Sequence, residues 1–130
     1  MVKSRPYVIL SAAITLDGKL GVKNKRTKLS SKNDKIRVHK LRSIVDAIII
    51  GKNTVNLDNP LLTVRHTKGK NPVRIILDSS GTIKSSSKII QTCNKVPTVI
   101  VVSELISEKN LQRLRKFSLE IIVCGKNSVN

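Results

Sequence analysis

The chain has 130 residues, and 25 Lys and Arg against 8 Asp and Glu give it a formal net charge of +17. Apolar residues make up 39% of the sequence, so a chain of this length can bury an aliphatic core, which argues against global disorder. The longest apolar runs are far shorter than the roughly 20 residues of a membrane helix, and no apolar signal segment opens the chain, so we expect one soluble, cytoplasmic domain without membrane contact.

The first predicted element is an apolar strand over residues 7–14 (YVILSAAI), which runs into the tight-turn dipeptide Asp17-Gly18. Residues 31–34 (SKND) match a capping box, and the apolar positions that follow predict a helix over residues 31–43. Residues 46–51 (DAIIIG) predict a second short strand. A strand, a capped helix and another strand together predict a βαβ crossover.

The second half of the chain alternates in the same way. Residues 52–59 are polar and Pro60 follows, so we expect a loop there. A helix is predicted over residues 107–116, with Leu111 and Leu114 turned inward. Further strands are predicted over residues 73–77, 98–102 and 119–123. This alternation predicts an α/β fold with a mainly parallel sheet, and no linker divides the single domain of residues 1–130.

A candidate ligand site follows the strand over residues 46–51. The spacing of the glycines excludes both a dinucleotide-binding fingerprint and a P-loop. The carboxyl end of a strand is nevertheless where open α/β sheets bind ligands. Gly51 would let a ligand approach the backbone, and Thr54 and Asp58 would offer hydrogen bonds to ribose or amide groups. The alternative is an ordinary connection between a strand and a loop, with Thr54 as a cap.

Basic side chains supply the other candidates. Arg42 and Arg65 can grip a phosphate as rigid forked donors, although in a chain this basic their position alone favours a solvated surface residue. Lys19 has the same alternative, at the tip of a turn. His39 and His66 have no acidic or nucleophilic companion at a recognisable spacing, so we predict no hydrolytic triad and no metal site, and expect both at the surface.

Two further features limit the function classes. Cys93 and Cys124 form no zinc-binding motif, and we expect both to be reduced thiols. The charge favours phosphate binding, but the basic residues are spread along the chain, and Tyr7 and Phe117 are its only aromatic rings. We therefore expect no dedicated nucleic-acid function, and a basic surface that also attracts phosphorylated small molecules.

Six segments carry a resemblance to a known family through their order and spacing. They are residues 5–9 (RPYVI), 15–20 (TLDGKL), 36–42 (IRVHKLR), 45–51 (VDAIIIG), 54–65 (TVNLDNPLLTVR) and 71–79 (NPVRIILDS). Together they resemble the reductases of riboflavin biosynthesis, over essentially residues 5–127. The resemblance implies a dihydrofolate-reductase-like fold, a three-layer sandwich around a mainly parallel sheet. It also implies a homodimer.

The resemblance further implies NADPH-dependent reduction of the ribosylamino group of a pyrimidine 5′-phosphate to the ribitylamino form, by hydride transfer to ribose C1. Lys19 is similar to the residue that meets the substrate's ribose oxygen, where a lysine can deliver a proton as the ring opens. The implied cofactor contacts are Gly51, Thr54, Asp58 and, near the adenosine side, Ser79. The implied grip on the substrate's 5′-phosphate consists of Arg42, Leu62 and Arg65.

The sequence also departs from the family. It shows no zinc deaminase signature, which favours the archaeal or fungal arrangement acting on the 2,5-diamino pyrimidinone, although the deaminated uracil stays open as a substrate. The family continues into a glycine-rich stretch that holds cofactor phosphates at a helix N-terminus. We therefore expect residues 1–130 to be the N-terminal two-thirds of the reductase domain, marginally stable or associated, and inactive alone. The alternative is a basic module that binds phosphorylated nucleotides or nucleic acid without catalysis.

Overall fold

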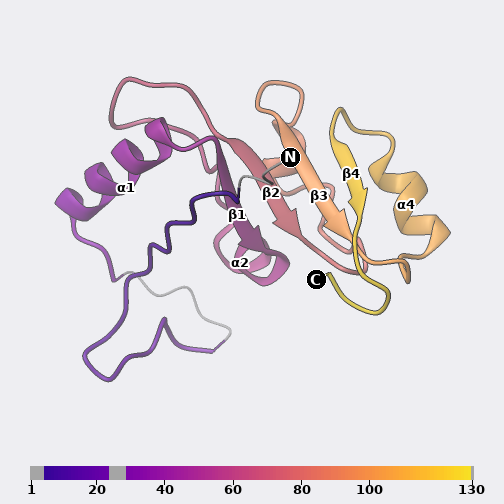
Figure 1. The fold of residues 1–130 in the computed structure, drawn as a ribbon, viewed down its shortest axis with the longest axis horizontal. Helices are drawn as coiled ribbons and strands as arrows, with labels where there is room; N and C mark the ends of the chain where they lie inside the picture. The colour runs from indigo at the N-terminus through magenta and orange to yellow at the C-terminus, as the bar shows by residue number, and fades with distance from the viewer. Residues whose placement is uncertain (1–4, 24–28, 130) are drawn as a thin grey trace.

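A single parallel sheet organises the chain in the computed structural model, which describes residues 5–23 and 29–129 (Figure 1). The strands are β1 (Ala47–Gly51), β2 (Val73–Leu77), β3 (Thr98–Val102) and β4 (Glu120–Val123). They pair in the order β1-β2-β3-β4, and every pair is parallel. The α/β fold class and these four predicted strands are confirmed, because each is a dense run of β-branched or aliphatic residues.

Within the described residues, four helices accompany the sheet: α1 (Lys32–Ile44), α2 (Lys52–Asp58), α3 (Lys88–Gln91) and α4 (Glu108–Leu114). Serine caps begin the two helices that the sequence predicted. The Ser31 hydroxyl accepts a hydrogen bond from the Asp34 amide at 3.1 Å, and the Ser107 hydroxyl accepts one from the Asn110 amide at 3.3 Å. None of the helices that the structure describes has the length and apolar composition needed to cross a bilayer.

The short helices α2 and α3 correct the sequence analysis, which expected a loop after β1. Gly51 is the N-cap of α2, so Thr54 lies inside the helix and does not cap it. Val55 is the only buried residue of α2, and a single apolar anchor leaves no periodicity to detect. Helix α3 has four residues, of which the adjacent Ile89 and Ile90 are buried.

The N-terminal segment, residues 5–23, is a second correction. It contains no strand, so the predicted strand over residues 7–14 and the βαβ crossover built on it are wrong for this structure. Tyr7 is 91% exposed and Leu10 is 92% exposed. The prediction depended on a distant pairing partner, which local pattern does not specify. The turn at Asp17-Gly18 is confirmed, since Gly18 adopts a φ of 76° and its amide donates to the Thr15 carbonyl at 2.9 Å.

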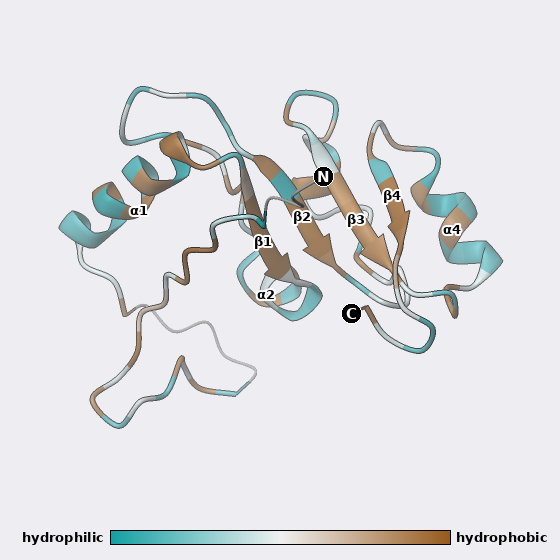
Figure 2. Cartoon of the chain, in the orientation of Figure 1, coloured by the Kyte–Doolittle hydropathy of each residue, from teal (hydrophilic) through white to brown (hydrophobic). Residues whose placement is uncertain are grey.

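The apolar core lies against one face of the sheet. Alternate strand residues such as Ile76, Ile100 and Val102 are fully buried there, and they pack against apolar side chains of the helices and loops. The predicted inward orientation of Leu114 is confirmed. The other face contributes exposed apolar residues, with Ile49 at 61%. Figure 2 shows the apolar character of the strands and the polar character of much of the helix surface.

A charged side chain, Arg74, lies inside this core. It is fully buried on β2, and burial lowers its pKa. Its guanidinium donates six hydrogen bonds, all to neutral oxygens. The acceptors are the hydroxyls of Thr92 and Thr98 and the carbonyls of Leu61, Ile89 and Val96. Arg74 therefore links β2 to β3, to α3 and to the loop that precedes β2.

Candidate functional site

The residues that the sequence assigned to a cofactor lie at the carboxyl edge of the sheet. Gly51 ends β1 beside Leu77, which ends β2, and α2 begins at the next residue. A Cβ atom added to Gly51 would meet no atom of the described residues within 4 Å, so the surface here is open. Thr54 and Asp58 are four positions apart on α2 and both exposed, which places them on one side of the helix.

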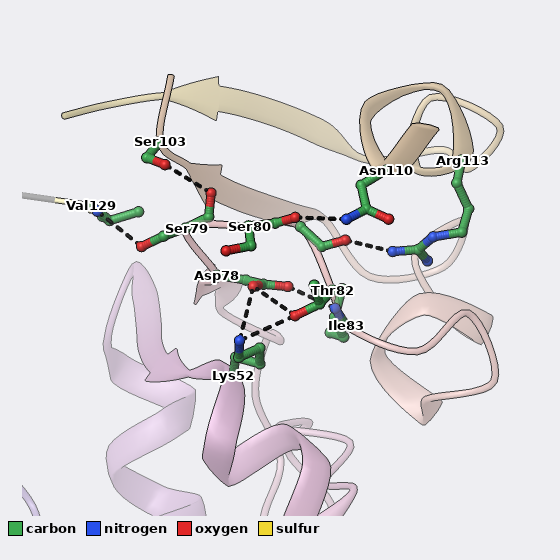
Figure 3. A network of polar contacts seen from close by, with 11 residues as sticks. Lys52, Asp78, Ser79, Ser80, Thr82, Ile83, Ser103, Asn110, Arg113 and Val129 are labelled. Atoms are coloured by element: carbon green, nitrogen blue, oxygen red, sulfur yellow. Dashed lines mark hydrogen bonds and ion pairs between the residues drawn. The ribbon is translucent and has the colours of Figure 1, made fainter. Parts of the chain in front are cut away.

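Ser79 follows β2 at the same edge and joins it to two other segments (Figure 3). Its hydroxyl accepts a hydrogen bond from the Val129 amide at 3.0 Å. Its carbonyl accepts two hydrogen bonds from Ser103, one from the amide and one from the hydroxyl, each at 3.0 Å. The Ser79 hydroxyl keeps its own hydrogen, so it can still donate to a ligand.

Lys52 and Asp78 are a pair at this edge that the sequence analysis missed. Asp78 is 1% exposed, and one carboxylate oxygen accepts from the Ile83 amide at 2.7 Å. The other oxygen lies 3.7 Å from Lys52 Nζ, which also donates to the Thr82 hydroxyl at 3.1 Å (Figure 3). The carboxylate therefore fixes the turn after β2 and holds an ammonium group beside it. The only signal in the sequence was an acidic residue directly after a strand.

Helix α4 holds the same turn from the other side. Arg113 Nη2 donates to the Gly81 carbonyl at 2.6 Å, and Asn110 Nδ2 donates to the Ser80 carbonyl at 2.9 Å. Gly81 adopts a φ of 63°, and an added Cβ would lie 2.5 Å from Ile106 Cδ1. The turn after β2 is thus held in one conformation by side chains from α2 and α4.

A second candidate site surrounds the loop of residues 61–65, which the resemblance assigned to the substrate. Leu62 is 4% exposed and adopts a φ of 57°, a left-handed conformation that costs an L-residue roughly 1–2 kcal/mol. Arg74 holds the start of the loop at the Leu61 carbonyl, at 3.1 Å. Asn71 accepts from the Val64 amide at 2.8 Å. The surrounding fold therefore imposes the shape of the loop.

Arg42 and Arg65 come together at this loop. Arg42 lies in the last turn of α1, and its Nη1 donates to the Thr63 carbonyl at 3.4 Å. Its Nε is buried and has no acceptor among the described residues. Burial lowers the pKa of Arg42, and the neighbouring Arg65 cation lowers it further. Within the described part of the chain, no carboxylate forms an ion pair with either side chain. This arrangement suits an anion.

His39 corrects a prediction, because it is 4% exposed and not at the surface. Its Nδ1 accepts a hydrogen bond from the Arg65 amide at 3.0 Å. The exposed ring of His66 meets the His39 ring edge-on, with 4.5 Å between the centroids. Burial is the main cause that lowers the pKa of His39, followed by the charges of Arg42, His66 and Arg65. Sequence spacing missed this role, because the partner of His39 is a backbone amide in a distant loop.

Lys19 does not join the other candidate residues. It lies on the exposed turn of the N-terminal segment, and its Nζ forms an ion pair with Asp17 at 3.1 Å. In Figure 1 the indigo start of the segment overlaps β1 in the view, whereas the purple loop that follows it lies apart from the sheet. Among residues 5–23 and 29–129, no group of three or more His, Cys, Asp or Glu side chains is placed to hold a metal ion.

Comparisons with known proteins give a consistent result. A family model described as the RibD C-terminal domain matches residues 6–130. The 2,5-diamino-6-ribosylamino-4(3H)-pyrimidinone 5′-phosphate reductase of Methanothermobacter thermautotrophicus is 41% identical over 129 residues, which cover 97% of this chain and 58% of the relative. A protein of the same name from Aquifex aeolicus is 36% identical over 131 residues, with the same coverage.

Solved structures agree with these relatives. A deaminase/reductase of Thermotoga maritima, described as a diaminohydroxyphosphoribosylaminopyrimidine deaminase and 5-amino-6-(5-phosphoribosylamino)uracil reductase, matches with a TM-score of 0.63 and 26% identity. The match covers 88% of this chain and 37% of that one. The yeast riboflavin biosynthesis reductase Rib7 matches with a TM-score of 0.55 and 27% identity, over 72% of this chain and 41% of that one. The chain spans 58% of the length of each of the two reductases from Methanothermobacter and Aquifex.

Proposed function

The chain belongs to the RibD C-terminal domain family, and from this membership we propose that it carries cofactor and substrate contacts of a reductase in riboflavin biosynthesis. The proposed reaction is the NADPH-dependent conversion of the ribosylamino group of a pyrimidine 5′-phosphate to the ribitylamino form. The names of the relatives from Methanothermobacter and Aquifex support it, and favour the 2,5-diamino pyrimidinone as the substrate. Because the chain spans 58% of each relative, the activity of the whole protein is part of the proposal.

The observation that carries the proposal is the meeting of Arg42 and Arg65. Arg42 Nη1 donates to the Thr63 carbonyl at 3.4 Å, and Arg65 follows two residues later in the same loop, where its charge lowers the pKa of Arg42. Among the described residues, no carboxylate forms an ion pair with either side chain. A phosphate between them would remove this repulsion and accept charge-assisted hydrogen bonds. We assign the substrate's 5′-phosphate to this position, with buried Leu62 fixing the loop that carries Arg65.

The chemistry of the sheet edge fits the nicotinamide cofactor that the family implies. Gly51 leaves the surface open, and the exposed Thr54 hydroxyl and Asp58 carboxylate can bind hydroxyl or amide groups. Ser79 keeps a hydrogen to donate towards the adenosine side. We propose NADPH as the cofactor, which when bound would supply the hydride. The contribution of these residues is alignment of the two ligands.

Three further assignments are part of the proposal. Proton delivery to the ribose ring oxygen by Lys19 is supported by the resemblance alone. The structure adds no support, because the turn that carries Lys19 lies apart from the sheet. The homodimer and the cytoplasmic location also remain predictions.

Calorimetric titration of the 130-residue chain tests the proposed function. We expect the phosphorylated pyrimidine substrate to bind more tightly than its dephosphorylated form, and NADPH to bind in preference to NADH at moderate salt. Equal affinity for the two substrate forms would remove the phosphate assignment. If NADPH failed to saturate the chain while an oligonucleotide bound with a steep salt dependence, the electrostatic binding module would be the better description.

A further inference from the structure

The hydrogen bond between Arg65 and His39 forms in only one protonation state of His39 Nδ1. The Arg65 amide donates to His39 Nδ1 at 3.0 Å, so that nitrogen must present a lone pair, and the ring proton must lie on Nε2. Protonation of Nδ1 would place two N–H groups against each other and break the contact. His39 is 4% exposed, so water has little access to replace the lost hydrogen bond.

The charges around His39 act in the same direction. Arg42 lies one turn later on α1, and Arg65 and His66 belong to the loop that packs against the helix. These groups and burial together lower the pKa of His39. The neutral ring is thus the form that this environment favours, and an imidazolium here would be a further cation beside two guanidiniums.

We propose that His39 is a positioning residue for the phosphate site, which holds the Arg65 backbone in its binding position only while Nδ1 is unprotonated. The proposal rests on the proposed function, which assigns Arg65 to the substrate's phosphate. It adds that phosphate affinity falls on acidification through loss of the His39–Arg65 contact. A purely electrostatic role would have the opposite sign, because a protonated His39 would attract the phosphate more strongly.

The test uses ribose 5-phosphate as the probe, with ribose as the reference that lacks the phosphate. Affinities for the 130-residue chain are measured between about pH 5 and pH 8, the range in which histidine titrates. His39→Asn is the matched control, because its amide oxygen can accept from the Arg65 amide but does not titrate. His39→Leu removes the acceptor. Titration of the probe's own phosphate is common to all three proteins and cancels in their comparison.

We expect acidification to weaken phosphate binding by the parent roughly tenfold more than binding by His39→Asn, the ratio that corresponds to one lost hydrogen bond. At pH 8 we expect His39→Asn to bind like the parent and His39→Leu to bind roughly tenfold more weakly. The proposal would be overturned if acidification weakened phosphate binding equally in the parent and in His39→Asn. It would also be overturned if the parent bound the phosphate more tightly in acid.

Nitrogen NMR of the ligand-free parent gives a readout that does not depend on how His39→Leu folds. We expect the proton of the neutral His39 ring on Nε2, and exchange protection of the Arg65 amide that is lost as His39 titrates. A proton on Nδ1 at pH 8 would contradict the proposal directly. If the parent bound ribose 5-phosphate no better than ribose, the phosphate assignment would fail, and this NMR result alone would decide whether His39 holds Arg65.

Discussion

Arg74 and Thr98 lie opposite each other on the adjacent strands β2 and β3, and the guanidinium donates twice to the single hydroxyl, from Nε at 3.1 Å and from Nη2 at 2.7 Å. The hydroxyl donates in turn to the Val96 carbonyl at 2.8 Å. Among the described residues, every hydrogen-bond acceptor of this buried cation is therefore a neutral dipole. Its removal would leave several buried oxygens without a donor.

We predict that Arg74→Ala lowers the free energy of unfolding by about 3 kcal/mol or more, because each unsatisfied buried carbonyl costs about 1–3 kcal/mol and a cavity is added. Thr98→Val should cost about 1–3 kcal/mol, since it takes the shared acceptor from a buried charge. Urea denaturation measures both. The exposed Arg115→Ala is the control, with an expected change within about 0.5 kcal/mol, and an equally small effect of Arg74→Ala would contradict our account of the core.

Thr54→Val and Asp58→Ala should each weaken NADPH binding by roughly 1–3 kcal/mol, the usual cost of an unpaired buried group in a complex. The reason is their shared side of α2 beside the open surface at Gly51. Calorimetry with NADPH measures the effect. Asn56→Ala, also exposed but turned away from Thr54 and Asp58 on the same helix, is the matched control. Loss of affinity in the control alone would place the cofactor on another face.

Arg42→Ala and Arg65→Ala should weaken binding of the phosphorylated substrate, by about 1.5–3 kcal/mol each, without changing NADPH affinity. In an enzyme that turns over, the same loss would be seen as a raised KM. Lys68→Ala removes an exposed positive charge close to Arg65 in the chain and should have little effect. If Lys68→Ala weakened binding as much as the arginine variants, the interaction would be with the general basic surface.

Gly81→Ala should destabilise the fold more than Gly18→Ala. Both glycines have a positive φ, 63° and 76°, so each alanine variant carries a similar backbone strain of roughly 1–2 kcal/mol. At Gly81 the new Cβ would also lie 2.5 Å from Ile106 Cδ1, whereas at Gly18 it would meet no described atom within 4 Å. Thermal unfolding of the two variants measures the difference, and equal midpoints would contradict the close packing at Gly81.

Acidification below about pH 6.5 should destabilise the parent. The pKa of His39 is lowered from its usual 6.5 in the folded state, so the unfolded chain binds the proton first. The free energy of unfolding is therefore highest above pH 6.5 and falls until the pH reaches the folded pKa. Urea denaturation across this range should show a weaker dependence in His39→Asn. The pKa values of Asp17 and Asp34 are lowered from 3.8, so these carboxylates take up protons only in more acidic solution.

The sequence was informative where structure is determined locally. Dense runs of aliphatic residues predicted the strands of the sheet, a capping box predicted α1, and the spacing of Leu111 and Leu114 predicted α4. It failed where the determinant is distant in the chain. The segment over residues 7–14 has the composition of a strand but no pairing partner in the structure, and α2 and α3 are too short to show periodicity.

In the candidate site, too, some features could be predicted from the sequence and others could not. Thr54 and Asp58 are four residues apart, so once α2 is known their shared side follows. Arg42 and Arg65 belong to separate elements, and only the fold shows that the Arg42 side chain contacts the loop that carries Arg65. His39 was wrongly expected at the surface, because a histidine that accepts from a backbone amide leaves no mark on side-chain spacing. The roles of these residues in binding stay predictions.

The position of Arg74 has a consequence for the order in which the chain folds. Each strand pairs with the one that precedes it in the sequence, so the sheet can grow by adding one strand at a time. The guanidinium acceptors, however, come from residues on both sides of β2, from Leu61 to Thr98. Until β3 is in place, Arg74 must either stay hydrated or lose its water without full compensation. We therefore expect the pairing of β2 with β3 to be the slow step of folding, with β1 and β4 free to add before or after it.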